Sequence, residues 1–431
     1  MKLFSPKLFS AFKGYNGHKL VSDLVAGLIV AIIALPLSIA LAIASGASPA
    51  QGLYTAIIAG FVIALLGGSN VNISGPTAAF ATIVAGVIAS NGFEGLVLAT
   101  VMAGIILIVL GVCRVGNLIK YMPHTITVGF TSGVAVTILI GQIKDFFGLD
   151  FGGAKPVEAG EKLIEIFKNF GTLSIKSLAV GAIGLAILIV WNVLGQKTKG
   201  VAKVIFTKIP ASIIAVIVGI LIVQFTPLKV ATIGTLYPDL SAGLPKFSLP
   251  SFKLDTLIAV IPDAFTIAIL AAIESLLSCV VSDKMIGDEH NSNTELIALG
   301  AGNVCSGLFG GIPATGAIAR TAANVKNGGR TPVAGIVHAL VLLLFLVVLM
   351  PVAKLIPMPI IAAILFMVAY NMSEWREFVG ICKTGKVGNI IVLAVTFLLT
   401  VILNLVFAIA VGIVLSLIFW LIAKKKAKKN A

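Results

Sequence analysis

Long apolar runs recur along this chain, and they constrain its fold more than any other feature. A membrane-spanning helix needs about 20 mostly apolar residues, and nine runs satisfy or approach that length. They are 22–44, 94–112, 123–147, 177–195, 209–225, 256–282, 332–350, 388–402 and 404–423. Their continuity excludes a membrane β-barrel, whose strands are shorter and alternate apolar with polar residues. The sequence therefore predicts an all-α polytopic membrane protein.

Five fainter or interrupted apolar stretches raise the expected number of spans to about fourteen. They are 49–67, 77–90, 294–309, 317–326 and 354–370. The composition agrees, since 58% of the 431 residues are hydrophobic and 11% are charged. In soluble domains, charged residues make up about 25% of the chain.

Basic residues are distributed unevenly between the segments that join these spans. With fourteen spans and a cytoplasmic N-terminus, 22 of the 31 lysine and arginine residues fall on the cytoplasmic side. This asymmetry is typical of the positive-inside rule, so we expect a protein of the cell's inner (plasma) membrane with both termini in the cytoplasm. The rule and contact with anionic lipid also account for the net charge of +14, so no nucleic-acid partner is expected. The scattered cysteines and histidines indicate neither a disulfide framework nor a metal site.

Two segments separated by a constant offset of 242 residues resemble each other. The matching residues are Gly60, Val62, Leu66 and Gly68 in the first segment and Gly302, Val304, Leu308 and Gly310 in the second. Both segments run into a Gly-rich stretch, a proline and a short helix. With an odd number of spans in each half, the second repeat (241–431) is inserted upside down relative to the first (1–240), as in many secondary transporters.

Each repeat is predicted to contain a half-helix that begins inside the membrane after a short extended strand. In the first repeat, Gly75 and Pro76 form the helix start, and only a short helix follows before Ser90. In the second repeat, Pro313 and Gly316 interrupt the chain in the same way. Non-helical backbone at this depth is buried in protein or lines a cavity. Two helix N-termini directed at a common point favour an anion there.

The predicted substrate site consists of the residues around these two helix starts. They are Thr77, Ala78, Ala79 and Phe80 in the first repeat and Gly316, Ala317, Ala319 and Arg320 in the second. Small side chains let an anion reach the backbone amides, although they also suit close helix packing. Phe80 suits the cavity wall and the core equally well. Arg320 would supply a fixed positive charge, unless its side chain extends from the helix end toward the cytoplasm.

Glu274 is the other charged residue within an apolar run. A carboxyl group at this depth is costly and is therefore expected to be functional. Ser278 lies one helical turn further on the same face. Burial disfavours the charged form of a carboxyl, so Glu274 is a candidate proton carrier with Ser278 beside it. Sodium coordination by the same face, or a structural hydrogen bond from Glu274 to the opposite repeat, remain alternatives.

Two further patterns predict local structure. Ser292 and Glu295 fit a capping box at the start of a helix. The segment 157–170 has apolar residues at Leu163, Ile164, Ile166 and Phe167 among charged ones, which predicts an external amphipathic helix on the bilayer surface.

Three stretches in this order resemble the SulP family of anion transporters, and the resemblance covers about residues 20–425. They are "GGSNVNISGPTAAF" (67–80), "ESLLS" (274–278) and "GGIPATGAIARTAANVKNGG" (310–329). The resemblance implies seven plus seven inverted repeats, with a core domain of spans 1–4 and 8–11 that moves against a gate domain of spans 5–7 and 12–14. It also implies an anion site between the starts of spans 3 and 10, and it adds Ile318 to the predicted site. Arg320 and Glu274 match the family's arginine and acid.

Several residues depart from the family's patterns. Leu37 follows Pro36 where many members have glutamine. The sodium-coupled bicarbonate members carry aspartate and threonine at the positions of Glu274 and Ser278, so this chain is more similar to the proton-coupled branch. The cytoplasmic STAS domain that usually follows the last span is not expected here. A homodimer is compatible with the resemblance.

These inferences together predict a secondary active transporter and not an enzyme. The expected cargo is a small anion, such as sulfate, bicarbonate or a dicarboxylate like fumarate. Coupling to protons is favoured over coupling to sodium, and no cofactor is expected. A sodium-coupled bicarbonate symporter and an uncoupled anion channel or exchanger remain the alternatives.

Overall fold

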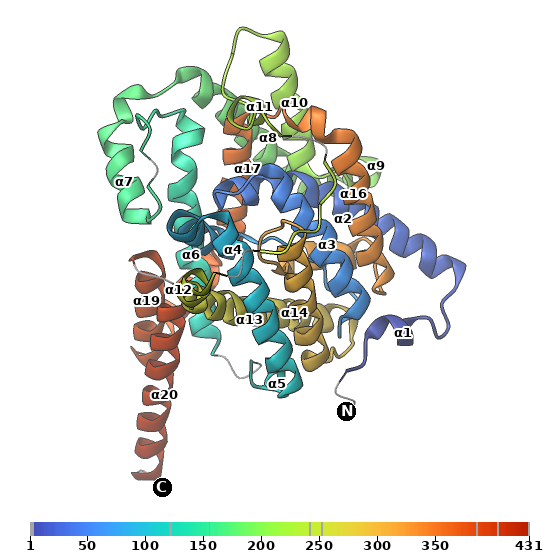
Figure 1. The fold of residues 1–431 in the computed structure, drawn as a ribbon, viewed down its shortest axis with the longest axis vertical. Coiled ribbons are helices and arrows are strands. Elements are labelled where there is room, and N and C mark those ends of the chain that lie inside the picture. The colour runs from blue at the N-terminus through green and yellow to red at the C-terminus, as the bar shows by residue number, and fades with distance from the viewer. Residues whose placement is uncertain are drawn as a thin grey trace.

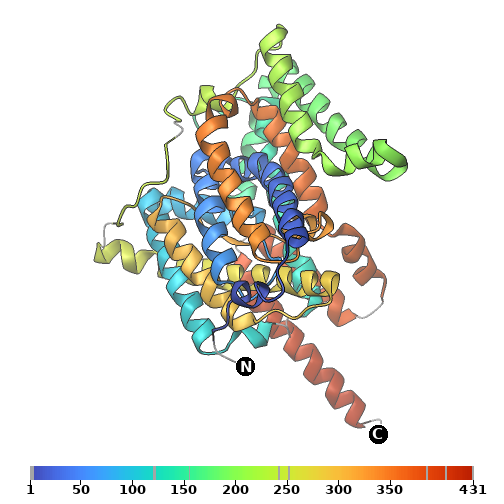
Figure 2. The same ribbon diagram turned by 90° about the vertical axis from the view of Figure 1, so that its right-hand side faces the viewer.

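The computed structural model describes residues 4–119, 123–154, 156–240, 243–250, 253–384, 387–402 and 405–429. Figures 1 and 2 show a bundle made almost entirely of helices. The first half contains α1 (Lys7–Ala11), α2 (Gly17–Ala44), α3 (Pro49–Leu66), strand β1 (Ser74–Gly75), the 3-10 turn η1 (Ala78–Phe80), α4 (Ala81–Val112), α5 (Gly116–Ile119), α6 (His124–Phe147), α7 (Ala159–Lys168), the 3-10 turn η2 (Phe170–Thr172), α8 (Ile175–Lys197), α9 (Gly200–Lys208), α10 (Ala211–Phe225) and α11 (Ile233–Leu236). The second half contains α12 (Leu254–Ala259), α13 (Ile261–Ile286), α14 (Ser292–Leu308), strand β2 (Thr315–Gly316), α15 (Ile318–Lys326), α16 (Val333–Ala353), α17 (Met358–Met372), α18 (Trp375–Lys383), α19 (Val387–Ile402) and α20 (Leu405–Lys429).

The helices confirm the predicted polytopic all-α fold. Within the described ranges, eight helical segments are long and apolar enough to cross a membrane, when η1 is counted with α4 and α17 with α18. The other predicted spans overlap shorter helices, such as α10, α14 and α15. The predicted spans 77–90 and 94–112 correspond to two helical stretches that meet at Gly92, where the backbone is not helical (φ 67°, ψ −177°) and the chain is kinked. Glycine tolerates this backbone conformation without steric cost.

The centre of the molecule is formed by helices from both halves of the chain. Helix α14 packs against α4 and α3, and α13 packs against α4 (Figure 1). The backbones of α4 and α14 approach very closely, since a methyl group on Gly104 would lie 2.6 Å from the carbonyl oxygen of Gly300. A separate apolar cluster lies between α8, α10 and α17. The interlocking of the first and second halves agrees with the predicted repeats.

The start of α14 differs from the predicted capping box. Asn291 is the N-cap, and its side-chain oxygen accepts hydrogen bonds from the backbone N–H groups of Asn293 and Thr294. The prediction of a Ser292–Glu295 capping box was therefore wrong, because the Glu295 side chain turns inward and accepts hydrogen bonds elsewhere. A helix within 157–170 is confirmed as α7 (Ala159–Lys168), while its place on the bilayer surface stays a prediction.

Candidate functional site

Strands β1 and β2 pair with each other and hold the two candidate helix starts together. We call the place where they meet the strand crossing. They form an antiparallel pair in which Ser74 faces Gly316 and Gly75 faces Thr315. All four residues are buried. Ser74 and Gly316 are separated by 242 positions, which is the offset of the two sequence repeats. Ser74 and Gly316 are therefore equivalent residues of the two repeats that pair with each other, as expected when a two-fold axis passes between them.

Both helices that leave this crossing begin without a side-chain cap. Thr77 is the N-cap of η1 and Ala317 is the N-cap of α15, and neither caps its helix by a side-chain hydrogen bond. The first N–H groups of a helix have no partner within the helix. They carry the positive end of the helix dipole, which favours an anion. The two starts thus have the chemistry that the sequence predicts for an anion site.

Arg320 lies in the first turn of α15 and turns toward the first repeat. Its side chain is 3% exposed, and Nη2 donates a hydrogen bond to the carbonyl oxygen of Pro76 over 3.0 Å. The alternative in which Arg320 extends toward the surface is therefore wrong. Its Nη1 is buried and has no hydrogen-bond partner among the described residues. Gly75 makes room for this nitrogen, since a methyl group there would lie 2.6 Å from Nη1.

Glu274 extends from α13 to the start of the other half-helix. Its Oε2 accepts a hydrogen bond from Thr77 Oγ1 over 2.8 Å, and the residue is 8% exposed. The Thr77 hydroxyl is therefore directed at Glu274 and not at its own helix. This bond joins α13 to the first repeat, and it is compatible with both a proton carrier and a structural anchor.

The other predicted site residues differ in their exposure. Ala78, Ala79 and Phe80 are buried, and Phe80 is among the largest fully buried side chains, so it belongs to the core. Ile318 and Ala319 are exposed on the first turn of α15. The structure thus brings the predicted residues to one crossing, and the open side of that crossing is formed by α15.

Ser278, which was predicted to act beside Glu274, has other hydrogen-bond partners. It is fully buried, and its Oγ donates to Asn72 Oδ1 over 2.7 Å and lies 3.1 Å from Thr321 Oγ1. No hydrogen bond joins it to Glu274 in the described part of the chain. The structure places Ser278 in a network behind the helix starts.

Asn72 is the centre of that network, and the sequence analysis did not identify it. Its Oδ1 accepts from Ser278 and from Thr321 (3.0 Å), and its Nδ2 donates to Glu295 Oε1 over 2.7 Å. Glu295 is fully buried. Its Oε2 accepts from the backbone N–H groups of Gly68 (2.8 Å) and the following residue (3.2 Å).

The network therefore fixes the extended segment before β1 to α13, α14 and α15. Thr321 also accepts a hydrogen bond from the Ile73 N–H, and Asn324 donates to the Val71 carbonyl oxygen. The only sequence signal was the presence of polar residues in an apolar context, such as Asn72 in "VNISGP".

The described residues contain no group of three or more histidine, cysteine, aspartate or glutamate side chains arranged to hold a metal ion. The chemistry available at the crossing is therefore that of free N–H donors, one guanidinium and one carboxyl group. These groups can bind and release an anion and a proton, and they do not include a nucleophile paired with a base.

Comparisons with known proteins agree with this chemistry. The sulfate permease family matches residues 20–396 of the chain. YvdB of Bacillus subtilis, whose name proposes that it transports sulfate, is 42% identical over 415 residues, which are 95% of this chain and 75% of YvdB. The bicarbonate transporter BicA of Picosynechococcus is 34% identical over 404 residues, which are 91% of this chain and 68% of BicA.

A solved structure is similar over nearly the whole chain. The transmembrane domain of a cyanobacterial bicarbonate transporter BicA superposes with a TM-score of 0.78 at 31% identity, covering 92% of this chain and 98% of that one. The chain belongs to the sulfate permease family, and it is a multi-pass membrane protein of anion transport and not an enzyme.

Proposed function

We propose that the protein is a secondary active transporter that moves a small oxyanion across the membrane by alternating access, in symport with protons. The observation that carries this proposal is the buried guanidinium of Arg320, whose Nη1 has no hydrogen-bond partner among the described residues. Burying an unsatisfied charged donor is costly. An oxyanion bound at the crossing would supply the missing acceptor, and a guanidinium is well suited to oxyanions.

The helix starts would hold the rest of the anion. The first-turn N–H groups of α15, at the exposed residues Ile318 and Ala319, point toward the start of the helix and would donate to the anion. The N–H groups after Thr77 would approach from the other repeat. The names of the relatives, a sulfate and a bicarbonate transporter, support an oxyanion as the cargo.

Glu274 would couple the anion to a proton. Its carboxyl group is buried and lies one hydrogen bond from the start of η1, through Thr77. A proton on Glu274 would reduce the negative charge next to an arriving anion, so anion and proton would bind more favourably together than separately. Release of the proton on the other side would then favour release of the anion.

We also propose how the protein is placed and assembled. The excess of basic residues in alternate connections supports cytoplasmic termini in a bacterial plasma membrane. The predicted core and gate domains would move against each other, and two chains would form a homodimer. Cysteine accessibility at the termini of intact cells and the mass of the detergent-solubilised particle test these two statements.

Arg320→Ala tests the anion site. Purified Arg320→Ala protein should lose anion binding, measured with labelled sulfate and bicarbonate, while it remains folded. Arg320→Lys should restore little of it, because lysine lacks the planar fork of donors. Lys326→Ala is a matched control, since Lys326 is an exposed cation on the same helix. Unchanged affinity in Arg320→Ala would contradict the proposed site.

Glu274→Gln tests the coupling. In proteoliposomes, an imposed inward proton gradient should drive accumulation of the anion in the unmodified protein and not in Glu274→Gln, while anion binding persists. Glutamine can still accept the hydrogen bond from Thr77. If Glu274 were only a structural anchor, the variant would therefore keep gradient-driven uptake.

A sodium-coupled bicarbonate transporter is the second candidate. It is favoured by the similarity to the bicarbonate transporter BicA. Uptake of bicarbonate that requires a sodium gradient at fixed pH and voltage would replace proton symport by this function, with the Arg320 site unchanged.

A further inference from the structure

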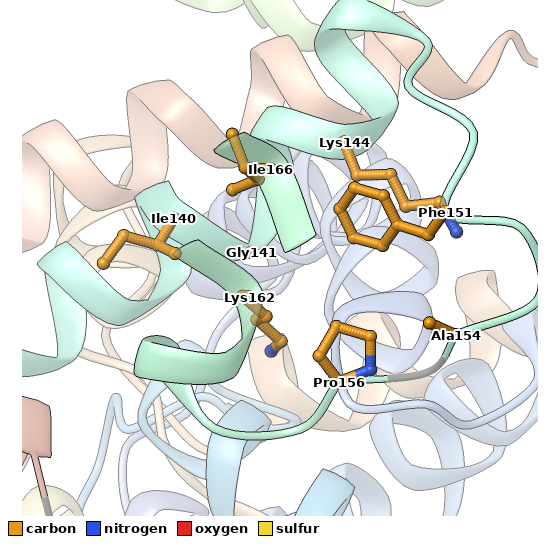
Figure 3. Close-up of a pocket in the computed structure, with 8 residues that line it drawn as sticks. All are labelled: Ile140, Gly141, Lys144, Phe151, Ala154, Pro156, Lys162 and Ile166. Atoms are coloured by element: carbon orange, nitrogen blue, oxygen red, sulfur yellow. The ribbon is translucent and has the colours of Figure 1, made fainter. Parts of the chain in front are cut away.

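A small hollow lies between the last turns of α6 and helix α7, away from the strand crossing. Its volume is about 140 Å³. It is lined by Ile140, Gly141, Lys144, Phe151, Ala154, Pro156, Lys162 and Ile166 (Figure 3). The walls are mostly apolar, and the charged side chains among these described residues are both lysines.

The two lysines approach the hollow from different elements. Figure 3 shows Lys144 coming from α6 and Lys162 from α7, on opposite sides of the hollow. The Lys144 ammonium lies 4.9 Å from the ring centroid of Phe151. Lys162 is partly buried, and its Nζ makes no hydrogen bond or ion pair with any of the described residues. Burial lowers the pKa of the Lys162 ammonium, and the nearby Glu161 offsets this only in part.

The acidic groups around the hollow have other partners. Glu161 accepts hydrogen bonds from the backbone N–H groups of the loop that precedes α7, at 3.1 and 3.4 Å. Glu165 pairs with Lys168 over 3.0 Å. Asp150 accepts from the backbone N–H of Gly152. None of these carboxylates lines the hollow.

Asp145 is the remaining acid on α6. It follows Lys144 in the chain, but it does not line the hollow, and no ion pair joins the two among the described residues. Among the described residues, the hollow is therefore lined by two lysines and apolar groups and by no carboxylate, although Asp145 lies close enough to Lys144, and Glu161 to Lys162, to attract them electrostatically. Apolar walls strengthen the attraction between an ammonium group and an anion, because the local dielectric constant is lower than that of water.

We propose that this hollow is an accessory site for a small oxyanion, bound between the ammonium groups of Lys144 and Lys162. Each ammonium offers three N–H donors, and an oxyanion such as sulfate offers acceptors on opposite sides. The site lies on different elements from the Arg320 crossing. Its binding of anions does not depend on the proposed transport cycle. With the proposed orientation, the site faces the outside of the cell.

Residue-specific labelling of lysine tests the site directly. The purified full-length protein is treated with an acylating reagent at constant ionic strength, in sodium gluconate or in sodium sulfate, and each lysine is quantified by mass spectrometry. Sulfate at about four times its dissociation constant should slow the labelling of Lys162 about fivefold, because labelling follows the unoccupied fraction. Lys176, which is exposed at the start of α8, should be labelled at the same rate in both salts.

Variants separate this site from the transport site. Lys144→Gln should abolish the protection of Lys162 by sulfate, whereas Lys168→Gln, which removes a lysine paired with Glu165, should preserve it. Arg320→Ala should also preserve it, so failure of the proposed function would leave this result intact. Equal protection of Lys162 and Lys176, or protection that persists in Lys144→Gln, would overturn the proposal. Protection by phosphatidylglycerol vesicles without protection by sulfate would also overturn it, because the occupant would then be a lipid phosphate.

Discussion

The network behind the helix starts can be tested by exchanging the donor and the acceptor of the hydrogen bond between Asn72 and Glu295. Asn72 Nδ2 donates to Glu295 Oε1 over 2.7 Å, while Asn72 Oδ1 accepts from Ser278 and Thr321. In Asn72→Asp the two accepted bonds can persist. The other carboxylate oxygen, however, then faces Glu295 over the same short distance.

The size of the effect follows from the proton that this pair needs. Two carboxylates in contact cannot both stay ionised, so the folded variant must bind one proton. An ordinary carboxyl group titrates near pH 4, and each pH unit corresponds to about 1.4 kcal/mol. Asn72→Asp should therefore lose about 4 kcal/mol of stability at pH 7. The folded variant binds a proton that its unfolded chain releases, so stability should be regained as the pH falls and lost as it rises.

The double variant Asn72→Asp/Glu295→Gln provides the matched control. Glu295→Gln alone replaces one accepting oxygen by an N–H₂ donor. This donor then faces either the donating Asn72 Nδ2 or the backbone N–H of Gly68, so two donors oppose each other. In the double variant, the new amide nitrogen donates to the new carboxylate, and the amide oxygen still accepts from the Gly68 N–H. At pH 7 the double variant should be more stable than either single variant, so the coupling energy between the two substitutions should exceed the loss of about 4 kcal/mol expected for Asn72→Asp alone.

Thermal unfolding of the detergent-purified proteins, followed by circular dichroism between pH 5 and pH 8, measures these changes. Additive effects of the two substitutions, or a pH-independent loss in Asn72→Asp, would refute the reasoning. Unchanged stability in both single variants would mean that the network does not hold the crossing together.

Three further predictions follow from single contacts. Burial and the Asp23 carboxylate raise the pKa of Tyr15 to about 12. In Asp23→Asn, ultraviolet titration should give a lower pKa for Tyr15 that is still above the ordinary value of about 10, and an unchanged pKa would contradict the contribution of Asp23. Gly75→Ala should weaken anion binding without changing any charge, because its methyl group would displace Nη1 of Arg320; unaltered binding would argue against the guanidinium's role. Gly104→Ala should lower the unfolding temperature and the yield of folded protein, since α4 and α14 would have to separate; a stability equal to the unmodified protein's would contradict this close contact.

The helices could be predicted because hydropathy is a local property. A run of about 20 apolar residues is sufficient to indicate a span, and the glycine and proline punctuation around Pro76 and Pro313 indicated the two interrupted segments. The pairing of Ser74 with Gly316 followed from the repeat offset in principle. The break between the predicted spans 77–90 and 94–112 was placed correctly, because Ser90 and Asn91 resemble the end of a helix and Gly92 interrupts the helical backbone with a positive φ.

The polar network could not be predicted in the same way, because its members are far apart in the chain. Asn72 and Glu295 are joined only when α14 packs against the segment before β1. Helical periodicity correctly placed Ser278 on the face of Glu274, but it could not distinguish a partner at the anion site from one behind it. Glu295 fitted a local capping pattern, but its carboxylate instead accepts hydrogen bonds from the backbone N–H groups of Gly68 and Ser69, which are distant in the chain.

The repeat offset also explains how a symmetric scaffold can carry an asymmetric site. Arg320 is the equivalent of Ala78 under the offset of 242 residues. A second arginine at position 78 would place two guanidinium groups at one buried crossing, where like charges repel strongly. Ala78 instead carries no charge, and the absence of a side chain at Gly75 leaves room for the single guanidinium. The symmetric backbone therefore supplies two helix starts, while the Arg320 side chain would set the charge of the proposed anion site, with Glu274 as the titratable group of opposite sign.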